Sequence, residues 1–313
     1  MSELSAILVN WNAGAELLNT LSALQVALVA TLLDSEVILV DNASIDGSAR
    51  TAAQKFPVLT VIYNSTNLGF GAANNIGFMH AQGRYTLLVN PDLRITSAAL
   101  QAMLNFMETH PQSGMCGPKV LESDGVTISP WCARRDPRPW DVFCEYAFLT
   151  KLFPQRRLFS RYVMGDWDHA SNREVNALTG ACLLVRREVI EQAGGFDERF
   201  FMYGEDIDWC RRIRRRGWQV WYVAAAEVQH EGAHSTRQID DRGSRWSLDS
   251  YLRYFHTWGS GFDLLKARLA LSCGNLVRAL IWSATAVGRP RQFRSASYRA
   301  GRYFLYALQA WAR

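Results

Sequence analysis

The chain has 313 residues, of which 49% are hydrophobic and 20% charged, a composition typical of a globular protein with an ample core. That length suits one large α/β domain, or one domain with an appendage. The net charge is +5, and residues 264–313 contribute basic side chains but no acidic one. The six cysteines form no C-x-x-C pair and no regular framework, which argues against a disulfide scaffold and indicates a reducing compartment. The first residues lack the pattern of a secretory signal, so we expect a cytoplasmic protein.

Short apolar runs alternate with helical stretches through the first 90 residues. Strands are predicted at 6–9, 36–40, 58–63 and 85–89, and helices at about 16–33 and 72–82. Strands that are apolar throughout are typical of a parallel sheet with helices on both faces. Each predicted strand ends in a polar loop rich in Asn, Asp or Gly, and open α/β sheets bind their ligands at that edge. The sequence therefore predicts an α/β fold with a ligand site along one edge of the sheet.

The glycines of these loops do not have the spacing of a dinucleotide-binding fold. That fold needs G-x-G-x-x-G directly after the first strand. Here the first loop has only Gly14, whereas Gly69-x-Gly71 follows the third strand and the next glycine is Gly77. The spacing argues against a dinucleotide site.

An acidic segment follows a glycine further along the chain. Gly204 interrupts an aromatic run, and Glu205 and Asp206 lie where a helix would begin, next to the positive end of its dipole. The helix would continue with Ile207 and Cys210 on its buried side. Two adjacent carboxylates at a helix start suit general-base chemistry. The alternative is a capped helix whose acidic first turn is solvated.

Six polar segments follow one another along the chain: 10–12 (NWN), 40–47 (VDNASIDG), 67–74 (NLGFGAAN), 90–92 (NPD), 180–182 (GAC) and 194–212. In this order they resemble the motifs of the family 2 glycosyltransferases, and within them a rhamnosyltransferase-like branch that acts in bacterial cell-surface polysaccharide assembly. The resemblance covers roughly residues 5–258. It implies a GT-A fold, with a catalytic domain over 1–258 and a helical tail over 259–313.

The resemblance implies a site for a nucleotide-sugar donor along these loops. Asp41 would accept the imide hydrogen of the pyrimidine, which a carboxylate can do. The other residues implied for the donor are Asn10, Asn12, Asn42, Ser44, Asn67, Gly69, Gly71, Asn74, Asn90, Asp92, Gly180 and Ala181. Gly180 and Ala181 would lie below the donor sugar, where small side chains allow close approach. Each asparagine alone is equally consistent with turn chemistry, because Asn side chains bond to nearby backbone.

The D-x-D metal motif of the family corresponds to Asn90-Pro91-Asp92, so its first position departs from the motif. Asp92 would be the sole carboxylate of this loop to bind Mg²⁺ or Mn²⁺ at the donor diphosphate. The family's second metal contact corresponds to His230. His230 also opens an H-E-x-x-H sequence that ends at His234, the pattern of a zinc hydrolase. That pattern works only on a helix, whereas here it follows a β-rich run and contains Gly232.

By resemblance the reaction is an inverting transfer in which Asp206 removes the proton of the acceptor hydroxyl. Glu205 would lie beside it in the acceptor site, and Asp208 would support either the helix or the side chains that line the site. The donor implied is dTDP-rhamnose, and the acceptor a glycan or a polyprenyl-linked glycan. The alternative is a family member that binds nucleotide or glycan without turnover. The intact group of Asp92, Glu205, Asp206 and His230 argues against it.

Two basic and aromatic segments remain. Residues 131–174 fit an acceptor lid, a membrane-facing loop or a solvated insertion; no RNA-binding strand motif accompanies them, so we expect no nucleic-acid partner. Residues 264–313 predict two or three helices, with an apolar stretch at 269–287 close to membrane-spanning length. We expect this tail to bind an anionic membrane surface peripherally, on the cytoplasmic face. A helical pair packed on the catalytic domain is the alternative. The sequence indicates no oligomeric state.

Overall fold

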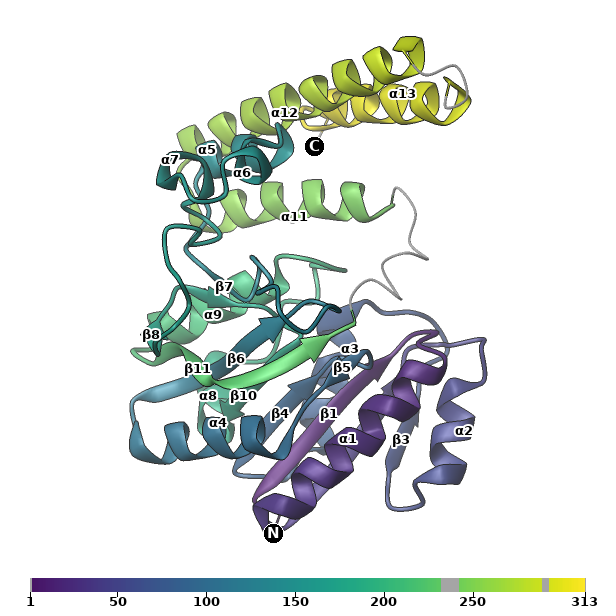
Figure 1. Ribbon diagram of the computed structural model, residues 1–313, viewed down its shortest axis with the longest axis vertical. Coiled ribbons are helices and arrows are strands. Elements are labelled where there is room, and N and C mark those ends of the chain that lie inside the picture. Colours follow the sequence, from purple (N-terminus) through teal and green to yellow (C-terminus); the bar gives the residue numbers. More distant parts are fainter. Residues whose placement is uncertain (1, 232–241, 289–292, 313) are drawn as a thin grey trace. The chain divides into compact units, whose positions relative to one another are not determined.

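The structure is a computed structural model that describes residues 2–231, 242–288 and 293–312 (Figure 1). Its chain forms two compact units, which we call the sheet unit (1–134 and 169–240) and the helical unit (135–168 and 241–313). These units do not divide at residue 258, because 135–168 and 241–258 belong with the tail. The division into a catalytic domain over 1–258 and a helical tail over 259–313 stays a prediction.

The sheet unit is built on strands whose side chains are mostly buried. Its strands are β1 (Leu4–Asn10), β2 (Ser35–Asp41), β3 (Thr60–Tyr63), β4 (Tyr85–Val89), β5 (Leu93–Arg94), β6 (Ser113–Leu121), β7 (Ala133–Arg134), β8 (Arg173–Glu174), β9 (Ala177–Leu178), β10 (Cys182–Arg186) and β11 (Gln219–His230). Among the described residues, nine of them form one sheet in the order β3-β2-β1-β4-β10-β6-β11-β5, with β8 paired to β11. The short strands β7 and β9 form a separate antiparallel pair.

The sheet is mostly parallel, as the apolar runs predict. β1 pairs in parallel with β2 and β4, and β3 extends the parallel part beyond β2. β10 is the exception inside the sheet, because it runs antiparallel to both β4 and β6. Every residue of β4 and β10 is buried, which explains why neither strand alternates between polar and apolar side chains.

Helices cover both faces of this sheet, as predicted. They are α1 (Ala15–Thr31), α2 (Ser48–Lys55), α3 (Phe70–His80), α4 (Ser97–Thr109), α8 (Arg187–Ala193) and α9 (Glu205–Arg215). Figure 1 shows α1 and α4 side by side on one face, and α3 and α8 behind the other. The leucines of α1 that face the sheet, such as Leu17, Leu21 and Leu24, are buried at helical spacing.

The helical unit consists of α5 (Pro139–Tyr146), α6 (Leu149–Leu152), α7 (Arg157–Ser160), α11 (Arg242–Trp258), α12 (Gly261–Gly288) and α13 (Phe293–Gln309). Its long helix α12 packs against α5, α11 and α13. The pair α12 and α13 agrees with the predicted tail helices, although Arg289 and Arg291 between them lie outside the described residues. The short helices α5 to α7 were not predicted, since helices of four to eight residues show little periodicity. Asp141 caps α5 by accepting a hydrogen bond from the Arg138 backbone N–H at 2.8 Å.

Candidate active site

One edge of the sheet gathers the loops that the sequence singled out. The parallel strands β1, β2 and β4 all end at this edge. β10 runs the other way, so its beginning lies there too: Cys182 pairs with Val89, and the Asn90 N–H donates to the Ala181 carbonyl at 2.8 Å. β6 is antiparallel to β10 and β11 is parallel to β6, which brings the end of β11 to the same edge. The structure therefore aligns the predicted segments along one rim.

The first part of the rim is a hydrogen-bonded group around Asn10. Its side-chain amide donates to Asp41 Oδ1 at 2.8 Å and to Ser44 Oγ at 3.0 Å, and the Asn12 backbone N–H donates to the same Ser44 Oγ at 3.0 Å. Asn10 and Asp41 are buried. Asp41 Oδ2 accepts a longer hydrogen bond of 3.3 Å from the Ser44 N–H. Each carboxylate oxygen has two lone pairs, so Asp41 keeps capacity for a further donor such as an imide.

A second group joins Asn42 to the loop before α3. The Asn42 amide donates to Asn67 Oδ1 at 2.8 Å and to the Gly69 carbonyl at 3.2 Å. The Gly69 N–H donates to the same Asn67 oxygen, and the Asn74 amide donates to the Phe70 carbonyl at 2.9 Å within α3. These bonds are turn chemistry that fixes the loop. The roles of these asparagines toward a nucleoside stay predictions.

The glycines of that loop allow it to approach the acidic segment closely. Gly69 has a φ of +89°, and a Cβ there would collide with the Phe201 carbonyl oxygen. A Cβ on Gly71 would lie 3.0 Å from the Phe196 Cβ and 3.8 Å from the Glu205 Cβ. A Cβ on Gly180 would lie 3.8 Å from the Asp206 Cβ. Three of the predicted segments therefore meet around the start of α9.

The acidic first turn of α9 is buried, which contradicts the solvated alternative. Gly204 precedes the helix with a φ of +81°, a conformation that favours glycine. Glu205, Asp206 and Asp208 are only 6%, 8% and 1% exposed. Asp208 forms an ion pair with Arg212 at 2.8 Å one turn later and so supports the helix, as expected.

The two carboxyl groups of the pair have different surroundings. Asp206 Oδ2 accepts hydrogen bonds from Arg134 Nη2 at 2.5 Å and from the Gly180 N–H at 3.2 Å. Glu205 Oε2 is buried and has no hydrogen-bond partner among the described residues. Burial and the negative charge of Asp206 raise the pKa of Glu205 to about 8, against the smaller opposing effects of a backbone hydrogen bond and Arg134. Both effects favour the protonated form of Glu205.

The sequence did not reveal Arg134. It lies on β7, and its partner Asp206 is 72 residues away along the chain. The only signal was its position directly after the apolar residues Cys132 and Ala133, because a cation needs a partner when it is buried.

Asp92 and His230 lie together at the far part of the rim. His230 ends β11 beside Leu93, and its Nε2 is hydrogen-bonded to Asp92 Oδ1 at 2.9 Å. Burial lowers the pKa of His230, but the hydrogen bond and the charge of Asp92 and the charges of two glutamates outweigh it, so the net shift is upward. His230 lies on a strand rather than a helix, which removes the geometry that an H-E-x-x-H zinc site needs; His234 lies outside the described residues.

These two donors fit a cation that is shared with a substrate. Within the described residues, no group of three or more His, Cys, Asp or Glu side chains could hold a metal ion by itself. One carboxylate oxygen and one imidazole nitrogen would occupy two coordination positions of a divalent cation. The other positions would be left to diphosphate oxygens and water, which is common for Mg²⁺ in proteins. The residues at Asp92 therefore suit a metal that arrives with the donor.

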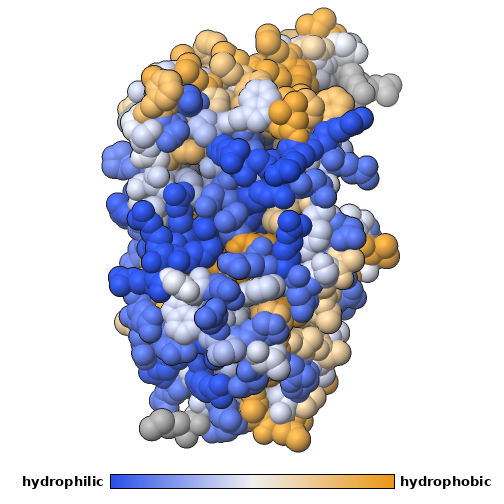
Figure 2. All heavy atoms as spheres, turned by 90° about the vertical axis from the view of Figure 1, so that its left-hand side faces the viewer, coloured by the Kyte–Doolittle hydropathy of each residue, from blue (hydrophilic) through white to orange (hydrophobic). Residues whose placement is uncertain are grey.

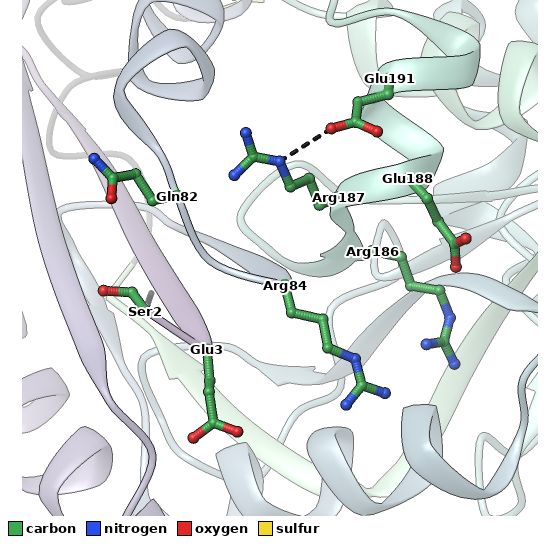
Figure 3. A pocket seen from close by; sticks show the side chains of 8 residues that line it. All are labelled: Ser2, Glu3, Gln82, Arg84, Arg186, Arg187, Glu188 and Glu191. Atoms are coloured by element: carbon green, nitrogen blue, oxygen red, sulfur yellow. Dashed lines mark hydrogen bonds and ion pairs between the residues drawn. The ribbon is translucent and has the colours of Figure 1, made fainter.

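A hollow of the sheet unit lies away from this rim. A cavity of about 740 Å³ lies at the opposite edge of the sheet, where β1 and β4 begin and β10 ends (Figure 3). Of its arginines, Arg84 is paired with Glu108 and Arg187 with Glu191, while Arg186 donates to backbone carbonyls. Two of these cations are therefore paired with carboxylates, and the third is held by hydrogen bonds to neutral groups.

Solved structures identify the class of fold. The crystal structure of GalNAc-T7 with UDP, GalNAc and Mn²⁺ matches with a TM-score of 0.57 over 88% of this chain and 51% of that chain. The mannosyltransferase PcManGT from Pyrobaculum calidifontis in complex with GDP-Man and Mn²⁺ matches with a TM-score of 0.55 over 100% and 88%. Both are 15% identical to this chain, so they show the fold alone. The fold is the GT-A fold of glycosyltransferases, as the resemblance predicted.

The chain belongs to the glycosyltransferase-like family 2, whose family model matches residues 2–248. It is 33% identical over 244 residues to the N-acetylglucosaminyl-diphospho-decaprenol L-rhamnosyltransferase of Mycobacterium tuberculosis, a match that covers 74% of this chain and 77% of that relative. It is 27% identical over 198 residues to the rhamnosyltransferase WbbL of Escherichia coli, covering 59% and 69%. The protein is thus a glycosyltransferase with rhamnosyltransferase relatives, and the predicted family is confirmed.

Proposed function

We propose that this protein transfers L-rhamnose from dTDP-rhamnose, with inversion, to a hydroxyl of a lipid-linked glycan that contains N-acetylglucosamine. The 33% identity to the mycobacterial relative, over most of both chains, supports the donor and the acceptor. The reaction type rests on one geometric observation: a buried pair of carboxyl groups, Glu205 and Asp206, of which Asp206 is held by a guanidinium.

In this proposal Asp206 is the general base. It accepts the proton of the acceptor hydroxyl while the acceptor oxygen forms its bond to the anomeric carbon. The bond from that carbon to the diphosphate breaks, and its electron pair leaves with the nucleoside diphosphate. Glu205 remains neutral, so the pair carries one negative charge and the site can accept one proton.

Asp92 and His230 would hold a divalent cation together with the donor. When bound, such a cation neutralises negative charge on the leaving diphosphate. The hydrogen bond of 2.9 Å between the two side chains keeps both donors together at the rim. The structural neighbours that contain Mn²⁺ support a divalent cation in this fold.

We further propose that the helical unit binds the cytoplasmic surface of an anionic membrane, where a lipid-linked acceptor lies. α12 is long and apolar enough to cross a membrane by length and composition, with 33% of its apolar window buried. Six of its seven exposed large apolar side chains recur every three, four or seven residues and so lie along one stripe: Phe262, Leu265, Leu269, Leu276, Leu280 and Val287. Figure 2 shows apolar side chains gathered over the helices of this unit.

The charges of these helices favour the same partner. Residues 264–313 contain no acidic side chain, and α13 carries arginines such as Arg294 and Arg299 as well as exposed aromatic rings such as Phe304. An apolar stripe next to basic residues is the pattern of an interfacial helix on anionic lipid.

The direct test of the donor and acceptor is a transfer assay. The purified protein is incubated with a polyprenyl-diphosphate N-acetylglucosamine acceptor and, in parallel, dTDP-rhamnose, GDP-mannose or UDP-N-acetylglucosamine, each with Mn²⁺ or with a chelator. We expect addition of one deoxyhexose only from dTDP-rhamnose, and only with the metal, by mass spectrometry. Transfer of another sugar would refute the donor, and binding of nucleotide without any transfer would favour a non-catalytic family member.

A further inference from the structure

Arg134 is buried next to the acidic pair and is fixed on two sides. Its Nη2 donates to Asp206 Oδ2 at 2.5 Å and to the Leu178 carbonyl at 2.8 Å. Its backbone is held in the β7–β9 pair, opposite Ala177. The side chains of Arg134 and Asp206 are 8% and 11% exposed, so this ion pair is largely removed from water and from screening by salt. A guanidinium placed in this way hydrogen-bonds to one carboxylate in one orientation.

The donors around Asp206 leave one of its oxygens better able to accept a proton. Oδ2 receives both Arg134 and the Gly180 N–H, which uses its two lone pairs. Oδ1 receives only the Ile207 N–H, at 2.8 Å, among the described residues. Oδ1 therefore keeps a lone pair for the hydrogen of an acceptor hydroxyl.

The charged groups close to the pair come from α9 and β7. The charges that act on Glu205 are those of Asp206 and Arg134. On α9 itself, Cys210 interacts with both of these groups and with Arg214, but its own thiol is fully buried and neutral at ordinary pH. β9 and the Gly180–Ala181 turn contribute no titratable side chain. Arg134 thus faces the pair as a cation from outside α9 and hydrogen-bonds to Asp206.

We propose that Arg134 is a positioning residue that keeps Asp206 ionised and oriented, and thereby leaves the single proton of the pair on Glu205. This assigns the base role to Asp206 and to its Oδ1 atom, and it rests on the proposed function only for the identity of the reaction. The contact with Arg134 explains why the two adjacent carboxyl groups of this buried site do not exchange roles. Without the guanidinium, the proton would be shared between them.

The first experiment needs no substrate. In the Glu205→Gln protein, Asp206 is the only carboxyl group left in the pair. Its protonated form has an infrared absorption band at a different frequency from that of carboxylates. Adding Arg134→Met should shift the pH at which this band disappears upward by about 1 to 3 units, since an opposite charge at this distance has an effect of that size. A triple variant that also carries Asp206→Asn should lose the band and so assigns it.

The second experiment measures kcat/KM of transfer against pH in otherwise unaltered proteins. Arg134→Met should move the midpoint of the rising limb to higher pH by a similar amount, so that activity lost at neutral pH returns in part at alkaline pH. Arg134→Lys keeps the charge but not the two-sided geometry of the guanidinium, and should shift the midpoint less. If Arg134→Met does not fold, both experiments are made with Arg134→Lys instead.

Arg212→Met is the matched control, because Arg212 pairs with the buried Asp208 on the same helix. It should leave the band and the midpoint where they are in the parent protein. The proposal is overturned if the folded Arg134 variants keep the parent titration, or if Arg212→Met shifts it equally. Absence of transfer by the wild-type protein would refute the proposed function, while the infrared titration would still decide the role of Arg134.

Discussion

Glu205→Gln should make the stability of the protein less dependent on pH. The pKa of Glu205 is about 8 in the folded protein, because of burial and the neighbouring Asp206, against an ordinary value of 4.5. The folded protein therefore binds one more proton than the unfolded chain between these two values. Stability conferred by that proton is complete below pH 4.5 and is lost as the pH rises through 8. Glutamine keeps the size of the side chain and cannot ionise.

The magnitude follows from the linkage of protons to folding. One pKa unit corresponds to about 1.4 kcal/mol, so wild type should lose about 2 to 3 kcal/mol of unfolding free energy between pH 6 and pH 8.5 that the variant does not lose. Other titrating groups are common to both proteins and cancel in the comparison. The measurement is urea unfolding of both proteins at the two pH values.

A surface variant supplies the control for that experiment. Glu191 is a glutamate whose side chain is 64% exposed, so Glu191→Gln should differ from wild type by the same amount at both pH values. If Glu205→Gln also shows a constant difference, Glu205 is not a buried neutral acid. The single-charge description of the pair would then be wrong.

Three further changes test the donor, metal and membrane sites. Asp41→Ala should weaken dTDP binding about 10- to 100-fold in calorimetry, the effect of losing a hydrogen bond to a charged group, with an unchanged circular dichroism spectrum; unchanged affinity would refute the pocket assignment. Asp92→Ala and His230→Ala should each abolish the stimulation of donor binding by Mn²⁺, and full stimulation in both would place the metal elsewhere. Replacing Leu269, Leu276 and Leu280 on α12 with Ser should lower affinity for anionic liposomes roughly 100-fold, because each exposed leucine contributes about 1 kcal/mol. The control replaces the exposed Val26, Val29 and Leu32 near the end of α1, and equal loss there would refute the stripe.

The sequence predicted the parallel half of the sheet because its signal is local. Residues 6–9, 36–40 and 85–89 are apolar runs that end in polar loops, and each became a buried strand that ends at the rim. Gly204 likewise predicted the start of α9 to the residue, since the charge pattern and the glycine both mark a helix start. Where side-chain pattern and backbone geometry coincide within a few residues, the prediction was accurate.

The remainder depends on contacts that a linear pattern does not contain. The antiparallel direction of β10 follows from where the chain enters the sheet, and its apolar residues fit either direction. The helical unit joins residues 135–168 to residues 241–313, two stretches that have no common motif. The burial of Glu205, and its partnership through Asp206 with Arg134, likewise depends on β7 and α9 meeting in space.

The most direct test of the catalytic account is the transfer rate of Asp206→Asn beside that of Glu205→Gln, with donor binding measured on the same preparations. Asparagine keeps the shape of the side chain and cannot take the proton, so transfer should fall about 10²- to 10⁴-fold while donor affinity stays within a few-fold of wild type. Glu205→Gln should reduce transfer less. A near-normal transfer rate of Asp206→Asn would contradict the role of Asp206 as the base. Loss of transfer in Glu205→Gln alone would make Glu205 the base, and loss in neither variant would remove the pair from catalysis.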